Sequence, residues 1–290
     1  FIFFLITYFN ENKEVINFFY KINVWYIFIF IGLAVINFVF RSFINIFIFK
    51  SLDINIQINE AFDLVIKNTI GNLLGPLKAG AGHNLHYMYK KYNLSPTLYI
   101  SSNTAFAILL LFINFLLLLL VTLTIDNLFN LSSFQTVLII VFSVLISIIV
   151  LKIFVKQKEN INIKFLKNFV IGFLSLFKNK VLFIQITITA VLYSFFNVVV
   201  LYFTFIMFEF GIKFKNTLLY TTLGSFTSIV KLTPGNIGFY EFVMISSSGF
   251  HGIQTNEILT SSIFLRSANY VAIILILSLS FLRRSIKTRK

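Results

Sequence analysis

Cysteine is absent from the 290 residues of this chain, and proline, tryptophan and acidic side chains are scarce. Without cysteine the chain cannot form a disulfide, a thiolate metal site or a cysteine nucleophile. Charged residues make up only 12%, whereas 58% of the residues are hydrophobic and the mean hydropathy is +0.91. A soluble domain could not bury so much apolar surface. The composition therefore predicts an integral membrane protein.

The hydrophobic residues fall into runs of about twenty, the length that an α-helix needs to cross about 30 Å of hydrocarbon. The run 106–121 is nearly continuous leucine, isoleucine and phenylalanine, without the alternation of a transmembrane strand. We therefore predict an all-α, polytopic helical bundle that forms a single membrane domain over residues 1–290. The clear predicted spans are 24–40, 98–124, 134–155, 181–208 and 258–282. The apolar stretch 1–9 is interpreted as the tail of a helix that starts before Phe1, or as a signal remnant.

Lysine and arginine in the connections predict the orientation of the chain. The segment 156–180 holds six lysines against the single acid Glu159, and the tail 283–290 is also basic. The positive-inside rule places both on the cytoplasmic side of the inner membrane, and the connection 126–133, which lacks lysine and arginine, outside. Basic residues beside the membrane suit anionic lipid head groups, so no nucleic-acid partner is predicted.

Two further segments contain chain breaks, and the predicted orientation limits how each segment can lie in the membrane. Segment 61–96 must begin and end inside, and it is broken at 75–82 by glycine and proline. Segment 217–251 must begin and end outside, and it is broken at 233–238. Lipid cannot satisfy the backbone groups that such breaks release. We predict two opposed re-entrant hairpins, the arrangement that an inverted repeat would give, with two ordinary spans and one charge-violating loop as the alternative.

Polar side chains at membrane depth are candidate site residues, because each charge there costs about 3 kcal/mol. Lys231 and Glu241 flank the second break, where they either approach a polar cavity or reach an interface. Arg266 and Asn269 share one face of the last span and are expected to face the interior near Glu241. Asn72, with Asn68 one turn earlier, marks a polar face of the first broken helix.

Enzyme signatures are missing from the sequence. The three histidines have no carboxylate or cysteine at ligand spacing, and we interpret them as interfacial residues rather than metal ligands. No nucleophile elbow, phosphate-binding glycine loop or pair of catalytic acids is present. The sequence therefore predicts no metal and no cofactor, and a transporter-like role rather than an enzymatic one.

The run 231–241, KLTPGNIGFYE, resembles the Pro-Gly-Gly-x-Gly-x-x-Glu signature of the flippase-like family, which includes the transmembrane region of lysylphosphatidylglycerol synthases. Asn236 replaces the second glycine of the signature, and we expect it to adopt a positive φ. Arg266 stands where the family carries an arginine one helix later. The run 72–95 resembles the first motif of the family, and Arg41 fits the arginine after the preceding span.

The first motif departs from the family pattern, since Ala81 and Asn84 stand where relatives often carry an acid and an arginine. The family's soluble synthase domain has no counterpart in this sequence. The resemblance implies translocation of a phospholipid or a polyprenyl-linked glycolipid by groups on the two broken segments. The residues predicted to bind or translocate this substrate are Arg41, Asn72, Pro76, Lys78, Gly80, Lys231, Pro234, Gly235, Asn236, Gly238, Glu241, Arg266 and Asn269.

Two other functions are kept open. One is a membrane-embedded transferase acting on a lipid-linked sugar, which would need Glu241 or another acid as a base. The other is a non-catalytic partner that recruits a synthase or glycosyltransferase through the basic segment 156–180. The sequence does not determine whether the chain forms a homo-oligomer.

Overall fold

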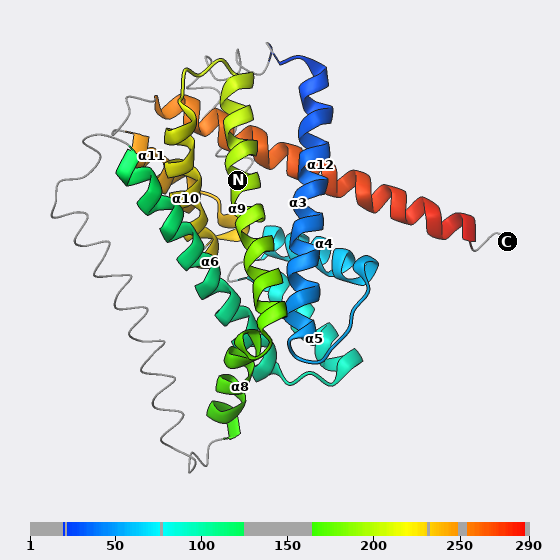
Figure 1. Ribbon diagram of the computed structural model, residues 1–290. Helices are drawn as coiled ribbons and strands as arrows, with labels where there is room; N and C mark the ends of the chain where they lie inside the picture. The colour runs from blue at the N-terminus through cyan, green and yellow to red at the C-terminus, as the bar shows by residue number, and fades with distance from the viewer. Residues whose placement is uncertain are drawn as a thin grey trace.

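The computed structural model describes residue 20 and residues 22–75, 78–124, 164–230, 233–248 and 254–287, and these residues form helices and connections without a strand (Figure 1). The elements in chain order are α3 (Val24–Lys50), α4 (Ile58–Leu74), α5 (Ala79–Tyr92), α6 (Pro96–Thr124), α8 (Lys164–Lys178), α9 (Lys180–Met207), α10 (Phe214–Val230), the 3-10 turn η1 (Pro234–Asn236), α11 (Phe239–Ser248) and α12 (Thr255–Lys287). The predicted all-α class is confirmed for this part of the chain.

Four helices are long and apolar enough to cross a membrane, namely α3, α6 over Pro96–Leu117, α9, and α12 over Thr255–Ser278. They correspond to four of the predicted spans, so the multi-pass membrane character is confirmed. The fifth predicted span, 134–155, lies outside the described residues. Figure 1 shows α3 and α9 side by side, with α12 crossing them obliquely.

Helix α3 extends well beyond the predicted span 24–40, and this corrects one expectation. Arg41 was expected in the connection after the span, but it lies inside α3, which continues to Lys50. Arginine is a good helix former, and a single charge does not end a helix. The end comes at Ser51, whose backbone N–H bonds to the carbonyl of Phe47. Arg41 therefore lies about 14 Å from Lys50 along the helix axis, roughly halfway through a bilayer.

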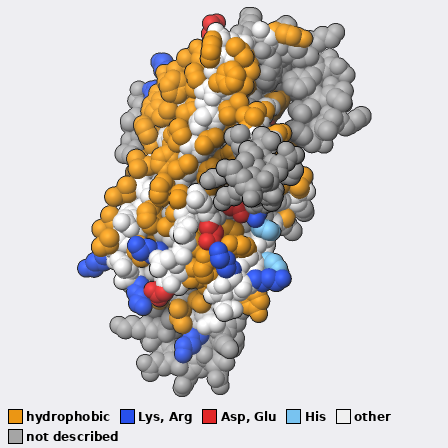
Figure 2. All heavy atoms as spheres, turned by 90° about the vertical axis from the view of Figure 1, so that its right-hand side faces the viewer, with side chains coloured by type: hydrophobic (Ala, Val, Ile, Leu, Met, Phe, Trp, Pro, Cys, Tyr) orange, Lys and Arg blue, Asp and Glu red, His pale blue; other side chains and the backbone are white. Residues whose placement is uncertain are grey.

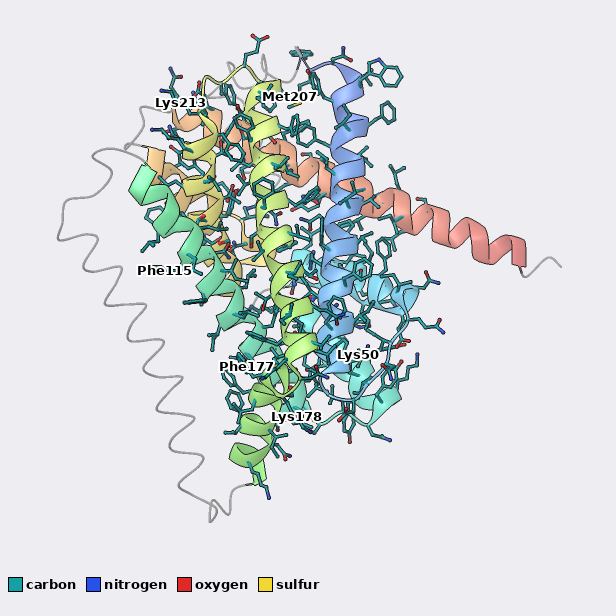
Figure 3. The ribbon with its side chains drawn as sticks, viewed as in Figure 1. Lys50, Phe115, Phe177, Lys178, Met207 and Lys213 are labelled. Atoms are coloured by element: carbon teal, nitrogen blue, oxygen red, sulfur yellow. The ribbon has the colours of Figure 1, made fainter. Side chains whose placement is uncertain are left out.

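Labelled lysines mark the two ends of the bundle. Figure 3 shows Lys50 and Lys178 at one end, and Met207 and Lys213 at the other. Lys50 and Lys178 both belong to regions that the charge pattern predicts to be cytoplasmic. Within the segment 156–180, residues Lys164–Lys178 form α8, which packs against α6. The glycine at position 172 allows this contact, because a Cβ there would overlap Ser101.

The two broken segments each form a pair of packed helices. The first runs from α4 to α5 and starts and ends at the Lys50 end, since it connects α3 to α6. The second runs from α10 through η1 to α11. It starts near Lys213, and α11 packs against α12 (Figures 1 and 3). The 3-10 turn of the second packs against α4 of the first. The breaks of the two segments therefore meet inside the molecule.

The first break is shorter than the predicted 75–82, because Ala79–Tyr92 is helical. Gly71 and Gly80 lie at the crossing of α4 and α5, where a Cβ on Gly71 would be 2.6 Å from the Cα of Gly80. A Cβ on Gly80 would overlap the backbone of Asn68. These glycines therefore serve close helix packing rather than chain breaking. Glycine has a low helix propensity, which is why the sequence pattern indicated a longer break.

Apolar side chains cover much of the outer surface, as a lipid-facing bundle requires. Figure 2 shows hydrophobic side chains over the upper part of one face, with charged side chains and the two described histidines gathered lower down. The histidines, His83 and His86, lie on α5 together with the exposed Lys90 and Lys91. Inside the molecule, an aromatic cluster packs α3, α9, α10 and α12 together through Phe30, Phe205, Tyr220 and Phe264.

Candidate functional site

The second break folds into a turn with three residues in the left-handed region. Gly235, Asn236 and Gly238 have φ values of 63°, 61° and 85°. Glycine adopts such values without strain, and asparagine tolerates them better than most residues. The positive φ expected for Asn236 is confirmed. The backbone N–H of Asn236 donates to the carbonyl of Thr233 at 2.9 Å, which closes the turn.

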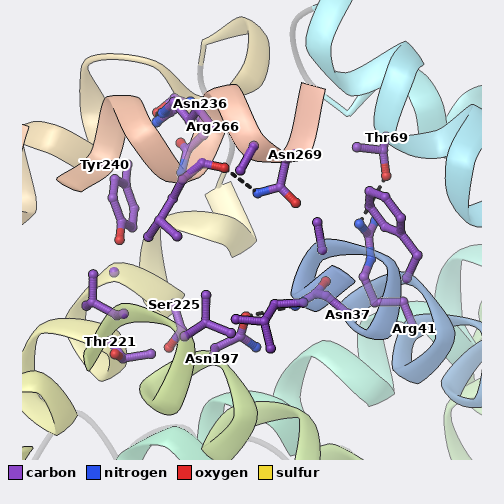
Figure 4. Close-up of a pocket in the computed structure, with 18 of the residues that line it drawn as sticks. Asn37, Arg41, Thr69, Asn197, Thr221, Ser225, Asn236, Tyr240, Arg266 and Asn269 are labelled. Atoms are coloured by element: carbon purple, nitrogen blue, oxygen red, sulfur yellow. Dashed lines mark hydrogen bonds between the residues drawn. The ribbon is translucent and has the colours of Figure 1, made fainter. Parts of the chain in front are cut away.

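Arg266 of α12 holds this turn in place (Figure 4). Its Nη1 donates to the carbonyl of Gly235 at 2.6 Å, and its Nη2 donates to the carbonyl of Asn236 at 3.2 Å. Its Nη2 also lies 2.7 Å from Glu241 Oε1, and its Nε donates to the same oxygen at 3.0 Å. The ring of Tyr240 packs 5.7 Å from the guanidinium carbon. The planar fork of arginine is suited to this combination of a carboxylate and two carbonyls.

Glu241 accepts hydrogen bonds from the turn and from α12. The backbone N–H of Gly238 donates to Oε2 at 2.7 Å, which caps the start of α11, while the hydroxyl of Ser262 and Arg266 donate to Oε1. The side chains of Glu241 and Arg266 are 14% and 16% exposed, so the pair is largely removed from solvent. The expectation that Arg266 faces the interior near Glu241 is confirmed. The pair joins α12 to the turn and to α11.

A cavity of about 460 Å³ opens beside the turn and is lined by α3, α4, α6, α9, α10, η1, α11 and α12. Its wall is rich in amides, hydroxyls and arginine for a site inside a membrane bundle. Figure 4 shows these side chains around a central space, with Arg41 and Thr69 on one side and Tyr240 on the opposite side. The polar lining residues are Asn37, Arg41, Thr69, Asn72, Asn114, Tyr193, Ser194, Asn197, Thr221, Ser225, Thr227, Asn236, Tyr240, Arg266, Asn269 and Tyr270.

Asparagine side chains link the helices around the cavity. The Nδ2 of Asn37 on α3 donates to Oδ1 of Asn197 on α9 at 2.9 Å. The Nδ2 of Asn236 donates to the hydroxyl of Thr227 at 2.7 Å, whereas its Oδ1 is buried without a hydrogen-bond partner. The Nδ2 of Asn269 donates to the carbonyl of Leu265 within α12 at 2.8 Å. The Oδ1 of Asn236 is therefore an unsatisfied acceptor inside the wall rather than on its surface.

Arg41 is the second arginine of the cavity wall. Its Nη1 donates to the hydroxyl of Thr69 on α4 at 3.0 Å, and that hydroxyl donates to the carbonyl of Val65 at 2.8 Å. Among the described residues, the ion pairs are Lys67 with Asp63, Lys91 with Glu60 and Arg266 with Glu241, so none of these carboxylates pairs with Arg41.

The structure brings together only part of the predicted site. Six predicted residues line the cavity: Arg41, Asn72, Gly235, Asn236, Arg266 and Asn269. Gly238 and Glu241 belong to the turn behind the wall, and Pro234 begins η1. Pro76 and Lys231 lie outside the described residues.

Lys78 and Gly80 stand at the first break. Lys78 has a φ of 60° and precedes α5 as its N-cap, and its burial lowers the pKa of the ammonium group below its ordinary value. The backbone N–H of Gly80 donates to Oδ1 of Asn72 at 3.0 Å, and Nδ2 of Asn72 donates to Asn68 at 2.7 Å. Asn72 therefore links α4 to α5. Lys78 is not among the residues that line the cavity.

Several cavity residues were not identified from the sequence, including Asn37, Thr69 and Asn197. Their signal was present, because an asparagine in the middle of an apolar span is costly unless it finds a partner. Asn37 also precedes Arg41 by one helical turn on α3, so the two share a face. What the sequence lacked was the pairing between distant helices.

A comparison with known protein families identifies the family of this chain. The family model for the lysylphosphatidylglycerol synthase TM region matches residues 1–276. The chain belongs to this family. The resemblance based on the 231–241 and 72–95 motifs is thereby confirmed. No curated protein and no solved structure matches the chain significantly. The activity has to be inferred from the site.

Proposed function

We propose that this protein binds the polar head group of an amphiphilic lipid in the cavity and translocates the lipid, or assists its translocation, across the membrane. The observation that carries the proposal is the polar cavity itself, at the meeting point of two broken segments in an otherwise apolar bundle. The substrate class is a phospholipid or a polyprenyl-linked glycolipid, whose chains stay in the lipid while the head group uses the cavity.

The energetic problem of lipid translocation is the head group. A charged or hydrogen-bonding group that enters hydrocarbon without partners loses several kcal/mol of hydration. The cavity offers amides, hydroxyls and Arg41 to replace water. With Lys50 at the edge of the hydrocarbon, Arg41 would lie at about mid-membrane depth, since about 14 Å separate the two along α3. A head group passing this point would be solvated where the barrier is highest.

The two broken segments supply a means of changing access. We treat α4–α5 and α10–α11 as re-entrant hairpins that enter from opposite ends, as in transporters with inverted repeats. Their breaks touch in the described state, since a Cβ on Gly235 would be 3.4 Å from Leu73 Cδ1. Movement of one hairpin against the other would open the cavity to one side at a time. The Arg266–Glu241 pair would keep the turn intact during this movement.

A transferase activity has less support. Of the described residues that line the cavity, none is an aspartate or glutamate. The predicted base, Glu241, accepts hydrogen bonds from Gly238, Ser262 and Arg266. A general base must reach the proton that it removes, and Glu241 does not line the cavity. The proposal of a recruiting partner is supported by no contact in the described part of the chain.

The test is a head-group accessibility assay in reconstituted vesicles. Purified protein is incorporated into vesicles that carry a fluorescent phospholipid, and an impermeant quencher reports the lipid that reaches the outer leaflet. The Ser225→Phe variant fills the cavity, and we expect it to slow the protein-dependent rate strongly. Ser246→Phe is the matched control, because Ser246 is exposed on α11 and does not line the cavity. Equal rates in the wild type, both variants and empty vesicles would refute the proposed function.

A further inference from the structure

The two arginines of the cavity wall differ in what they can offer a ligand. A guanidinium has five N–H donors. Arg266 uses most of them on Glu241 and on the carbonyls of Gly235 and Asn236. Arg41 makes one described hydrogen bond, to Thr69, and has no ion-pair partner among the described residues. Arg266 is therefore neutralised by its partner, and Arg41 supplies the uncompensated positive charge of the described wall.

Two asparagines of the wall, Asn37 and Asn269, direct an amide oxygen towards the cavity. Each donates one N–H of its amide to a protein acceptor. Figure 4 shows the amide oxygens of Asn37 and Asn269 turned towards the central space. These oxygens accept hydrogen bonds, so their natural partners are hydroxyl or ammonium groups of a ligand.

The charge of the wall decides between these two kinds of donor. An ammonium group in the cavity would face Arg41, and none of the described lining residues is a carboxylate that could compensate it. Like charges a few ångströms apart at an effective dielectric constant of about 20 repel by a few kcal/mol. Hydroxyl groups satisfy the same oxygens without this penalty. A phosphate beside them would pair with the free N–H groups of Arg41.

We infer that the cavity selects lipids whose head group combines a phosphate with hydroxyl groups, and that it discriminates against cationic, aminoacylated head groups. The inference rests on the proposed function, in that a lipid head group occupies the cavity. It goes further by assigning phosphate binding to Arg41, hydroxyl binding to Asn37 and Asn269, and a structural role to Arg266. The chain would accordingly handle an unmodified anionic lipid or a lipid-linked sugar rather than a lysyl-lipid.

Equilibrium binding tests this without requiring transport. Purified protein in nanodiscs of phosphatidylcholine is titrated with fluorescent phosphatidylglycerol, and unlabelled lipids then compete. We expect phosphatidylglycerol to compete about tenfold better than lysyl-phosphatidylglycerol, which carries the extra positive charges. Soluble glycerol 1-phosphate forms a separate arm, which shows whether the phosphate and hydroxyls suffice or the lipid chains are needed. Competition by glycerol 1-phosphate alone at similar concentration would refute a lipid ligand.

Charge variants locate the site. Arg41→Gln should weaken phosphatidylglycerol binding about tenfold and reduce the preference over the lysyl-lipid. Lys50→Gln is the matched control, since it removes the same charge from an exposed position on the same helix, outside the cavity wall. Thermal unfolding checks that each variant is folded, and Arg41→Lys, which retains the charge, should bind more tightly than Arg41→Gln.

The outcomes separate this inference from the proposed function. Equal competition by the two lipids, or equal binding by Arg41→Gln and Lys50→Gln, would overturn the inference. Selective binding without any protein-dependent transport in vesicles would support the inference and refute translocation. Efficient transport of the lysyl-lipid would support translocation and overturn the selectivity.

Discussion

Replacing Arg266 with methionine removes one half of a largely buried ion pair. The side chain of Glu241 is 14% exposed and would keep only Ser262 and the Gly238 N–H as donors. Breaking a buried pair on one side costs about 3–5 kcal/mol, because the remaining charge is left uncompensated. The carbonyls of Gly235 and Asn236 would also lose their donor. We therefore expect Arg266→Met to be strongly destabilising.

The double variant, Arg266→Met with Glu241→Gln, isolates the contribution of charge. Glutamine can accept the Gly238 N–H with its oxygen and donate its amide N–H to the hydroxyl of Ser262, and no buried charge remains. What is lost is the pair of carbonyl contacts, at about 1 kcal/mol each. The double variant should therefore be about 2 kcal/mol less stable than the wild type, and more stable than Arg266→Met alone.

Unfolding in mixed micelles with increasing sodium dodecyl sulfate, followed by circular dichroism, measures these differences. Fluorescence of Trp25 is unsuitable, because this single tryptophan is 69% exposed near the start of α3 and belongs to another part of the molecule. Arg41→Gln is the control, since it loses one hydrogen bond to Thr69 and no described ion pair. The single variant Glu241→Gln completes the comparison. If Arg266→Met stays within about 0.5 kcal/mol of the wild type, the pair does not hold the turn. The same follows if the effects of Arg266→Met and Glu241→Gln add up to the effect of the double variant.

Three further predictions concern packing, topology and pH. Gly80→Ala should destabilise the protein in thermal unfolding, because the new Cβ overlaps the α4 backbone, whereas Gly82→Ala meets nothing within 4 Å and should be neutral or slightly stabilising. Single cysteines at Lys178 and Lys213 lie at opposite ends of the bundle, so an impermeant reagent should label the first only from the cytoplasm and the second only from outside; labelling of both from one side would contradict the topology. Burial alone would raise the pKa of Glu60, but hydrogen bonds from a lysine and two tyrosines outweigh it and lower the pKa. Its stabilising contribution is present above the unfolded pKa and is lost as pH falls through the lower folded pKa, so Glu60→Gln should lower the thermal midpoint at about pH 7 but not at about pH 3.

Local sequence signals predicted the elements well where a single physical cause dominates. Apolar runs long enough to cross hydrocarbon predicted the spans that became α3, α6, α9 and α12, because lipid favours helices and excludes unpaired backbone. The Pro-Gly-Asn-Ile-Gly run predicted the turn, because few residues adopt a positive φ. The pattern was weaker for the first break, where glycines that serve helix crossing looked like chain-breaking residues.

Local sequence signals did not predict which side chains of the candidate site contact one another. The sequence by itself indicated that Arg266, Asn269 and Asn72 must avoid lipid, since polar groups are costly in hydrocarbon. Only the tertiary structure decided the partners: Arg266 pairs with Glu241 and the turn carbonyls, while Arg41 contacts Thr69. Partner choice depends on which helices pack together and on distances between residues far apart in the chain, such as Asn37 and Asn197. That arrangement left Arg41 as the charge facing the cavity.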